Sequence, residues 1–398
     1  MGHILVIGGG TAGTATALAL HKAGFDVTVY EAHPDAAEDI GAFLTLASNG
    51  MRALAQIDAS AAVTALGFPL TGMRVLDGSG AEVASRPLGE AEDPVLRYRC
   101  MRRGELNAAL QAEVSRRGIT IRHGVRLASV QGGPESVTAH FADGSTATGD
   151  LLVGADGLHS TVRRSIAPDA RPCYAGEYVF YGYTTDASLP EDTERITFSR
   201  SSSAAFGHAV SPAGEAYWFA RVAGEPLSPE EIAAGTPTRW RDLLVPLLRE
   251  DATPAAGIVA ATAGDILVTN ATEMPPAMPW RSGRSLLIGD AAHAASPATG
   301  QGASMALEDA VVLAKALRDA PDTETALSLY ETLRRPRVEH NITVSGQISR
   351  GAAAPTRPTS PPPRPGDEAA LIRLLEWDAD ISTTDISTTD ISTPPAGS

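Results

Sequence analysis

The sequence predicts an α/β protein in which a Rossmann-like dinucleotide-binding domain carries an inserted, mainly antiparallel β-sheet. Two observations support this fold class. At the start of the chain, a strand, a glycine-rich turn, a helix and a second strand form a βαβ unit. Between about residues 174 and 222, short segments of alternating hydrophobicity replace the helical pattern. The first pattern is typical of nucleotide binding, and the second adds a separate sheet.

The individual elements follow from apolar periodicity and from glycine stops. In the βαβ unit, residues 3–7 and 27–30 are predicted strands, and the helix over 14–23 ends at Gly24. The other predicted strands span residues 119–122, 137–141, 151–153, 178–184, 195–199, 206–211, 215–222 and 285–288. The other predicted helices span residues 106–117, 238–250 and 323–349, and one more helix begins near residue 302.

Composition restricts the function classes. The chain has 398 residues, 43% of them hydrophobic, which is enough for one large or two medium domains. Its 32 Lys and Arg against 47 Asp and Glu give a net charge of −15, which disfavours nucleic acid and anionic membranes as partners. The two cysteines, Cys100 and Cys173, lack metal-ligand spacing, so we expect reduced thiols and no metal site.

Targeting signals are not visible in the sequence. The chain starts directly with a predicted strand, and it contains no apolar run of the roughly 18 to 20 residues that a membrane-spanning helix requires. We therefore expect a cytoplasmic protein without a membrane span. Its partner is expected to be a small molecule, and a monomer and a homodimer both remain open.

The turn after the first strand fits the G-x-G-x-x-G pattern of dinucleotide binding. Gly8 permits the tight turn, Gly10 lets a pyrophosphate approach the backbone, and Gly13 allows close helix packing. Thr11 and Ala12 begin the helix, whose N-terminus faces the phosphate charge. We interpret this turn as a cofactor site; a glycine turn without a ligand is the alternative.

Three further features strengthen this interpretation. Glu31 ends the second strand, where a carboxylate can accept hydrogen bonds from an adenosine ribose. Two more glycine-containing motifs follow predicted strands. The second motif includes Asp156, Gly157 and Arg163, and the third includes Gly289, Asp290, Pro297, Gly300, Gln301 and Gly302. In the third motif, a helix starting near Gly302 directs its positive end inward, which can stabilise negative charge on a bound cofactor.

With these three motifs in order, the chain resembles the class A flavoprotein monooxygenases over about residues 1 to 350. This family includes p-hydroxybenzoate hydroxylase, salicylate and hydroxynicotinate hydroxylases and the tetracycline-inactivating monooxygenases. The resemblance implies a p-hydroxybenzoate hydroxylase-like fold that binds FAD. It also implies that Glu31 holds the adenosine ribose, that Asp290 holds a ribityl hydroxyl and that Arg103 lies near the FAD phosphates. Arg102 is then expected to be a surface charge.

The resemblance and the element pattern together suggest a division of the chain. We expect residues 1–72, 97–173 and 265–352 to form a discontinuous FAD-binding domain, and 73–96 and 174–264 to form the substrate domain. Residues 353–398 contain a proline-rich linker and a repeat of Asp-Ile-Ser-Thr-Thr, which is a low-complexity tail. A short helix over 368–377 could interrupt this tail.

The resemblance also implies the chemistry. NAD(P)H reduces FAD after docking transiently, the reduced flavin activates molecular oxygen, and an electron-rich ring is hydroxylated. The predicted activity is a single-component FAD-dependent monooxygenation of an aromatic or polyketide-like molecule, as in natural-product tailoring or antibiotic modification. A reductase or NAD(P)H oxidase on the same fold, without oxygen insertion, is the alternative.

Departures from the family pattern concern the flavin and substrate surroundings. Within residues 41–49, Phe43 replaces a glycine of the family, and Ser304 stands where many members have asparagine. The segment around Phe180 and Tyr181 lacks a tryptophan and an arginine that a related branch carries.

The aromatic residues of the inserted sheet are the candidate substrate contacts. Because strand residues alternate between faces, half of them are expected to point into ordinary core instead. His208 and Tyr181 are the candidates for a catalytic base, although a lone strand histidine is more often structural. The substrate candidates are Phe180, Tyr181, Tyr183, Phe198 and Trp218.

Overall fold

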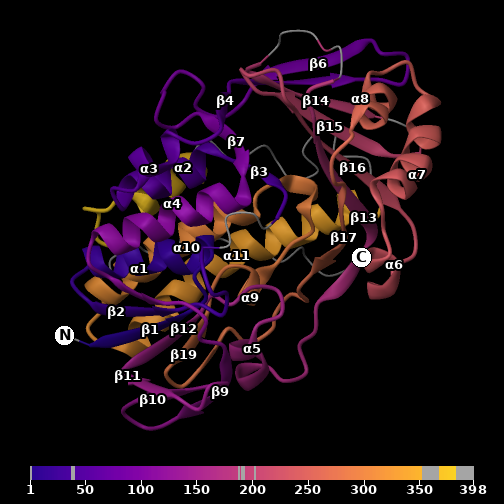
Figure 1. Cartoon of the computed structure of the whole chain (residues 1–398). Helices are drawn as coiled ribbons and strands as arrows, with labels where there is room; N and C mark the ends of the chain where they lie inside the picture. Colours follow the sequence, from indigo (N-terminus) through magenta and orange to yellow (C-terminus); the bar gives the residue numbers. More distant parts are fainter. Residues whose placement is uncertain are drawn as a thin grey trace, which may run out of the picture.

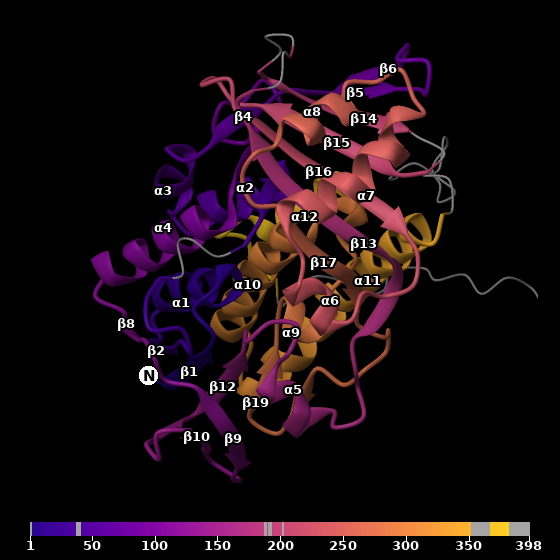
Figure 2. The same cartoon turned by 45° about the vertical axis from the view of Figure 1, so that its right-hand side comes forward.

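The computed structural model describes residues 2–36, 41–186, 189, 193–200, 203–351 and 367–381. The chain forms one part around a six-stranded sheet and a second part around a seven-stranded sheet, which lie side by side (Figures 1 and 2). The predicted proline-rich linker and most of the terminal repeat fall outside the described residues. Among the described helices, none combines the length and apolar character that crossing a membrane requires.

The six-stranded sheet is built from strands that are almost continuously apolar, as parallel strands covered on both faces require. β1 (His3–Ile7) pairs in parallel with β2 (Asp26–Tyr30) and β12 (Leu151–Gly154), and α1 (Thr11–Lys22) connects β1 to β2. The predicted βαβ unit is thus confirmed. The outer strands are β8 (Thr120–Arg122), β19 (Ser285–Leu287) and the antiparallel β18 (Arg281–Ser282).

Helices and two small sheets surround this sheet. The long apolar helix α10 (Gly302–Asp319) packs against α1, and its other sides contact α2 and α11. The further helices are α2 (Ser48–Gln56), α3 (Ser60–Thr64), α4 (Arg103–Arg116), α5 (Thr161–Ile166), α9 (Asp290–His293), the 3-10 turn η1 (Pro297–Thr299) and α11 (Thr323–Ser349). The small sheets contain β3 (Phe43–Leu46), β7 (Tyr98–Arg102) and β4 (Phe68–Leu70), and β9 (Leu127–Gly132), β10 (Val137–Phe141) and β11 (Thr146–Gly149).

The seven-stranded sheet has the order β17-β13-β16-β15-β14-β5-β6 and is antiparallel except for the pair of β14 and β5. Helices cover one of its faces, and the other face lies toward β3. The strands are β5 (Gly72–Leu76), β6 (Glu82–Pro87), β13 (Cys173–Thr184), β14 (Arg195–Arg200), β15 (Ala205–Val210), β16 (Ala216–Ala223) and β17 (Leu267–Glu273). The neighbouring helices are α6 (Pro229–Ala233), α7 (Pro237–Arg249) and α8 (Ala255–Ala261).

The topology differs at one point from the expected division of the chain. β17 lies beyond residue 265 and was therefore expected in the FAD-binding part, but it pairs with β13 in the seven-stranded sheet. The physical reason is that β13 needs a second antiparallel neighbour besides β16, and β17 supplies it. Near the C-terminus, α12 (Asp367–Leu375) lies against α2 and α10.

Candidate active site

The glycine turn between β1 and α1 has the geometry of a phosphate cradle. Gly8 has φ +108°, and a Cβ there would lie 2.4 Å from the Ala155 carbonyl oxygen. A Cβ on Gly13 would lie 1.9 Å from the Gly8 carbonyl oxygen, so both glycines are required for packing. At Gly10, by contrast, a Cβ would meet nothing within 4 Å. The open side of the turn is therefore at Gly10, at the N-terminus of α1, where a pyrophosphate can approach.

Glu31 lies directly beside this turn. Its carboxylate accepts hydrogen bonds from the Gly9 amide at 2.5 Å and from the His33 amide at 2.6 Å. The carboxylate is thus fixed in position by backbone donors, and its remaining lone pairs are available to ribose hydroxyls. Contact with an adenosine ribose stays a prediction.

Two residues of α4, which the sequence analysis did not single out, support the glycine turn. Gln111 donates from Nε2 to the Gly9 carbonyl oxygen at 2.8 Å, and Asn107 accepts from the Thr11 hydroxyl at 2.9 Å. They are four residues apart and so share one face of the helix. The signal in the sequence that could have found these two residues is a pair of amide side chains at helical spacing.

The second motif joins the other two motifs. Asp156 accepts from the Ser160 hydroxyl and from the amides of Thr161 and Val162, which fixes the start of α5. The Arg163 guanidinium is buried and donates to the Ala291 carbonyl oxygen at 3.0 Å. These side chains hold the loops together, and their contact with a cofactor remains a prediction.

The third motif reaches the glycine turn from the end of β19. Gly289 has φ +55°, and a Cβ there would lie 2.9 Å from the Ala12 Cβ, so the two motifs touch. Asp290 follows as an exposed side chain at the first position of α9. Pro297 begins η1, Gly300 ends it with φ +65°, and Gln301 immediately precedes α10, which begins at Gly302. The N-terminus of α10 therefore follows directly on this loop, and Gly302 at its start is exposed.

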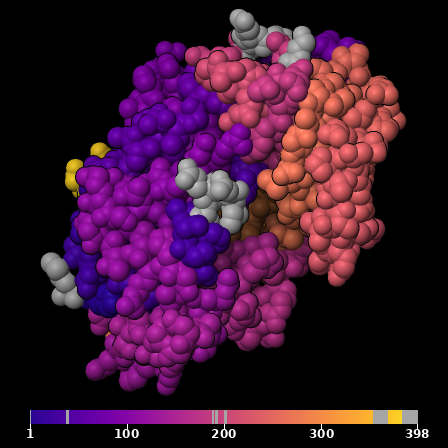
Figure 3. All heavy atoms as spheres, viewed as in Figure 1, coloured from indigo at the N-terminus to yellow at the C-terminus, as the bar shows by residue number. Residues whose placement is uncertain are grey.

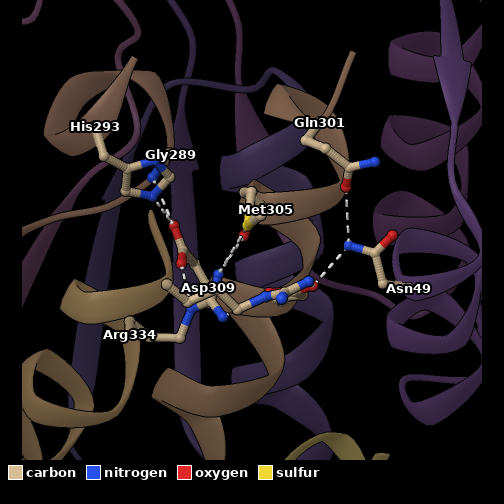
Figure 4. A network of polar contacts seen from close by, with 9 residues as sticks. Asn49, Gly289, His293, Gln301, Met305, Asp309 and Arg334 are labelled. Atoms are coloured by element: carbon tan, nitrogen blue, oxygen red, sulfur yellow. Dashed lines mark hydrogen bonds and ion pairs between the residues drawn. The ribbon is translucent and has the colours of Figure 1, made fainter. Parts of the chain in front are cut away.

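A buried network of charged groups supports this third motif (Figure 4). Asp309 on α10 accepts from the Gly289 amide at 3.0 Å and lies 2.5 Å from His293 Nε2. Arg334 on α11 donates from Nε to Asp309 at 2.8 Å and from Nη2 to the Met305 carbonyl oxygen at 3.1 Å. Although burial opposes ionisation, His293 and Arg334 lower the pKa of Asp309 to about 2. Asp309 is thus a fixed anion behind the loop.

Glu308 extends the network to α2. It accepts from Asn49 Nδ2 at 2.6 Å and from Arg334 Nη1 at 2.5 Å, and Arg337 completes its partners. Asn49 also donates to the Gln301 side chain at 3.2 Å, as Figure 4 shows. The buried pair Glu308 and Asp309 therefore links Gln301 and Gly289, which lie on opposite sides of the loop.

On the side that packs against β3, the seven-stranded sheet presents an aromatic face, which we define as Tyr181, Tyr183, Phe198, Tyr217 and Phe219. Phe43, which replaces a family glycine, packs edge-on against three of these rings, with centroid distances of 5.6 to 6.1 Å. Several members of the aromatic face are only partly buried. Figure 3 shows a hollow in the surface between the two parts of the molecule.

The remaining aromatic candidates lie on the other face of the sheet. Phe180 and Trp218 are fully buried in the core beneath α7 and α8, and Trp218 donates to the Thr262 hydroxyl at 2.9 Å. His208 is opposite Trp218 in the ladder and shares that face. Burial, aided by Arg74, lowers the pKa of His208 to about 4. The expected alternation is confirmed, and these three residues point away from the aromatic face.

Comparison with known proteins places this site in a family. Residues 2–345 match the family model described as an FAD binding domain. An aurachin C monooxygenase/isomerase from Stigmatella aurantiaca is 32% identical over 354 residues, which cover 87% of this chain and 88% of the relative. A 2-heptyl-3-hydroxy-4(1H)-quinolone synthase from Pseudomonas aeruginosa is 34% identical over 347 residues, covering 84% and 86%. The chain is a class A flavoprotein monooxygenase.

A solved structure gives the same fold for this monooxygenase. Klebsiella pneumoniae HpxO, crystallised with FAD and uric acid, has a TM-score of 0.79 and 27% identity, and the match covers 95% of this chain and 93% of HpxO. A 3-amino-4-hydroxybenzoate 2-monooxygenase from Streptomyces cremeus is 31% identical over 348 residues, covering 84% of each chain. The p-hydroxybenzoate hydroxylase-like fold and the FAD cofactor are thereby confirmed, with NAD(P)H as the typical reductant.

The described residues fit FAD in this monooxygenase. The open side of Gly10, the exposed Asp290 and the N-termini of α1 and α10 lie along one continuous edge of the six-stranded sheet, where parallel strands end. Arg103 begins α4 next to this edge and packs near Gly41. The structure thus brings most of the predicted cofactor residues together.

Arg102 was expected to be a surface charge, and its side chain is 37% exposed. Its guanidinium also stacks on the Tyr183 ring, 4.0 Å from the centroid, which was not predicted. Its Nη2 also contacts both carboxylate oxygens of Glu215, at 3.0 and 3.1 Å. The two residues are 113 positions apart, so no local pattern indicated the pair.

Proposed function

We propose that this monooxygenase hydroxylates the ring of a small aromatic molecule, which lies between the flavin site and the aromatic face. The observation that carries the proposal is the position of that face, whose partly exposed rings pack around Phe43 of β3, the strand in which Thr45 lies beside Gly300 of the flavin loop. Aromatic walls favour flat rings through stacking and edge contacts. The relatives from Stigmatella and Streptomyces are named for oxygenation of aromatic molecules, which agrees with this choice.

The chain's own residues have binding and positioning roles in this proposal. Bound FAD supplies the redox chemistry with NAD(P)H and oxygen. The N-terminus of α10 would stabilise negative charge on a bound, reduced flavin, and the aromatic face would exclude water from the substrate ring. Burial raises the pKa of Tyr181, although Arg103 and Arg221 oppose this effect. Tyr181 is therefore protonated at neutral pH and donates a hydrogen bond rather than accepting a proton.

The second candidate is a reductase or NAD(P)H oxidase that uses the same flavin site without inserting oxygen. It requires no aromatic face next to the flavin. The relatives from Stigmatella and Streptomyces, which match over most of the chain, are named monooxygenases, which favours oxygen insertion. We therefore place hydroxylation first.

Ligand-dependent flavin reduction tests the proposal. FAD-loaded protein is mixed with NADH or NADPH, with and without phenols, aminohydroxybenzoates and 4-quinolones, and flavin bleaching is followed. We expect at least one ring compound to accelerate bleaching by about tenfold or more. If no aromatic compound in the panel changes the rate, the proposal is contradicted.

A pair of variants then tests the position of the ring. Phe219→Ala, on the aromatic face, is expected to raise the KM of the accelerating compound. Phe206→Leu, on the helix-covered face of the same sheet, is the matched control and is expected to leave this KM unchanged.

A further inference from the structure

Two of the arginines that border the aromatic face, Arg102 and Arg221, are each paired with a glutamate. Arg102 comes from the end of β7 and Glu215 from the start of β16, so their contact joins the two parts of the molecule across the edge of the face. Glu215 is itself fixed, because its amide donates to the Ser211 hydroxyl at 3.1 Å. The backbone of Glu215 is therefore fixed at the position from which its carboxylate contacts Arg102.

A second arginine at this face is paired in the same way. Arg221 follows Phe219 on β16 and lies 3.3 Å from Glu177 on β13. Glu177 also accepts from the Ser349 hydroxyl on α11 at 2.6 Å. Both arginines are thus neutralised by a glutamate of the sheet region, and neither presents an uncompensated positive charge to a ligand.

The tyrosines between these pairs are neutral as well. Burial raises the pKa of Tyr183 and of Tyr217 to about 12, and the charge of Glu215 acts in the same direction while that of Arg102 opposes it. The Tyr183 hydroxyl is buried and makes no hydrogen bond of ordinary geometry with the described residues, although the Phe43 backbone lies close enough to oppose the rise in its pKa. A ligand that supplies a neutral acceptor would satisfy it.

We propose that the Arg102–Glu215 pair makes this site selective for neutral aromatic rings and against ring carboxylates. The proposal rests on the proposed function, because it assigns the substrate to the aromatic face. Glu215 accepts from Arg102 Nη2 with both carboxylate oxygens, so a ring carboxylate that approaches this guanidinium meets the negative charge of Glu215. The pair therefore acts as a repulsive element against anionic ligands, while neutral rings stack without disturbing it.

Two matched probes test this selectivity. The probes are 4-hydroxy-2-methylquinoline, which is neutral, and 4-hydroxyquinoline-2-carboxylate, which has a carboxylate in place of the methyl group. Each is titrated into FAD-loaded protein, and the change in the flavin absorbance spectrum gives Kd. We expect the neutral probe to bind at least about tenfold more tightly than the carboxylate.

Variants of the pair identify its contribution. Glu215→Gln keeps the shape but frees Arg102, and it is expected to tighten carboxylate binding by about tenfold while changing the neutral probe by less than about threefold. Adding Arg102→Met to this variant is expected to abolish that gain. Glu230→Gln, an exposed glutamate on α6, is the control and is expected to leave both Kd values unchanged. Retained FAD content shows that each variant is folded.

Three results would overturn the proposal. A carboxylate that binds the parent protein as tightly as the neutral probe would refute the selectivity alone, as would Glu215→Gln if it shifted both probes equally. In these two cases the hydroxylase function still stands. If neither probe altered the flavin spectrum and no panel compound accelerated bleaching, both the selectivity and the proposed function would fail.

Discussion

At the scale of single residues, the cofactor site is defined by where the backbone leaves room. Gly8 and Gly13 have no space for a side chain because neighbouring backbone fills it, whereas Gly10 faces open space. Asp290 is exposed at the same edge, although its neighbours Gly289 and Ala291 are buried. One glycine and one carboxylate therefore lie where a bound FAD requires space and a hydrogen-bond acceptor.

Substitutions at these two positions are expected to remove FAD. Gly10→Val fills the space left for the pyrophosphate, and Asp290→Ala removes the acceptor for a ribityl hydroxyl, so both purified proteins are expected to lose most of their yellow colour. Flavin absorbance per protein measures this. Gly264→Val and Asp265→Ala, two exposed neighbours in a loop, are controls. A fully yellow Asp290→Ala protein would contradict the placement of the third motif.

His208 illustrates how burial changes the assignment of a titratable residue. With a pKa of about 4 it is neutral at pH 7, and it lies on the helix-covered face. An unfolded histidine has its pKa near 6.5, so the unfolded chain binds the extra proton first as pH falls. Stability linked to His208 is therefore complete above pH 6.5 and is lost progressively toward pH 4.

His208→Gln is expected to reduce this pH dependence. The lowered pKa corresponds to about 3 kcal/mol of unfolding free energy between pH 6.5 and pH 4. Urea unfolding at several pH values in this window measures it, and the variant is expected to show a shallower slope than the parent. His159→Gln, at an exposed position, serves as the comparison. Equal slopes in parent and His208→Gln would show that the buried histidine is not the cause.

At the scale of elements, the flavin loop is held by two helices rather than by its own sequence. α10 supplies Glu308 and Asp309, and α11 supplies Arg334, all of them without solvent exposure. The Asp309 carboxylate contacts the backbone of Gly289 directly. The position of the third motif thus depends on the packing of α11 against α10.

Arg334→Met is expected to destabilise the protein by about 3 to 5 kcal/mol, because it leaves two buried carboxylates without their shared cation. Arg335→Met, on the same helix, removes partly exposed ion pairs with Glu331 and Glu339 and is expected to cost about 1 kcal/mol. Denaturant unfolding compares the two variants. If Arg334→Met cost no more than Arg335→Met, the network would not be the support described here.

At the scale of the whole molecule, α12 near the C-terminus packs against the part of the molecule that contains the six-stranded sheet. Lys315 on α10 is buried and donates to the carbonyl oxygens of Leu374 and Glu376, at 2.6 and 2.5 Å. Burial lowers the pKa of Lys315 to about 8. The Trp377 ring lies between Lys22 and Arg318, at 4.9 and 5.0 Å. These anchors lie at the C-terminal ends of α1 and α10, away from the cofactor edge.

Removing residues 353–398 is expected to lower stability without removing FAD. The buried side chains of Leu375 and Ile381 contribute about 2 kcal/mol each, so thermal unfolding is expected several degrees lower. Flavin content is expected to match that of the full chain. A truncated protein that is folded but colourless would contradict the separation between these anchors and the cofactor edge.

The sequence predicted those parts of the molecule that depend on local patterns. The βαβ unit, the strands of the inserted sheet and the position of the third motif before α10 all follow from hydrophobic spacing and glycines. The pairing of Arg102 was not predicted because its partner Glu215 is distant in sequence, and Arg334 was missed for the same reason. For Phe180 and Tyr181, strand alternation required opposite faces, but only packing decided which face lies toward the flavin.

The most direct test of oxygen insertion is isotopic labelling. Under ¹⁸O-labelled oxygen gas, FAD-loaded protein is supplied with NAD(P)H and a ring compound that accelerates flavin bleaching, and the product is analysed by mass spectrometry. A monooxygenase is expected to give a hydroxylated product that carries one ¹⁸O atom for each NAD(P)H consumed in coupled turnover. Continued NAD(P)H consumption with an unlabelled, unchanged ring compound would contradict oxygen insertion and favour the reductase or oxidase.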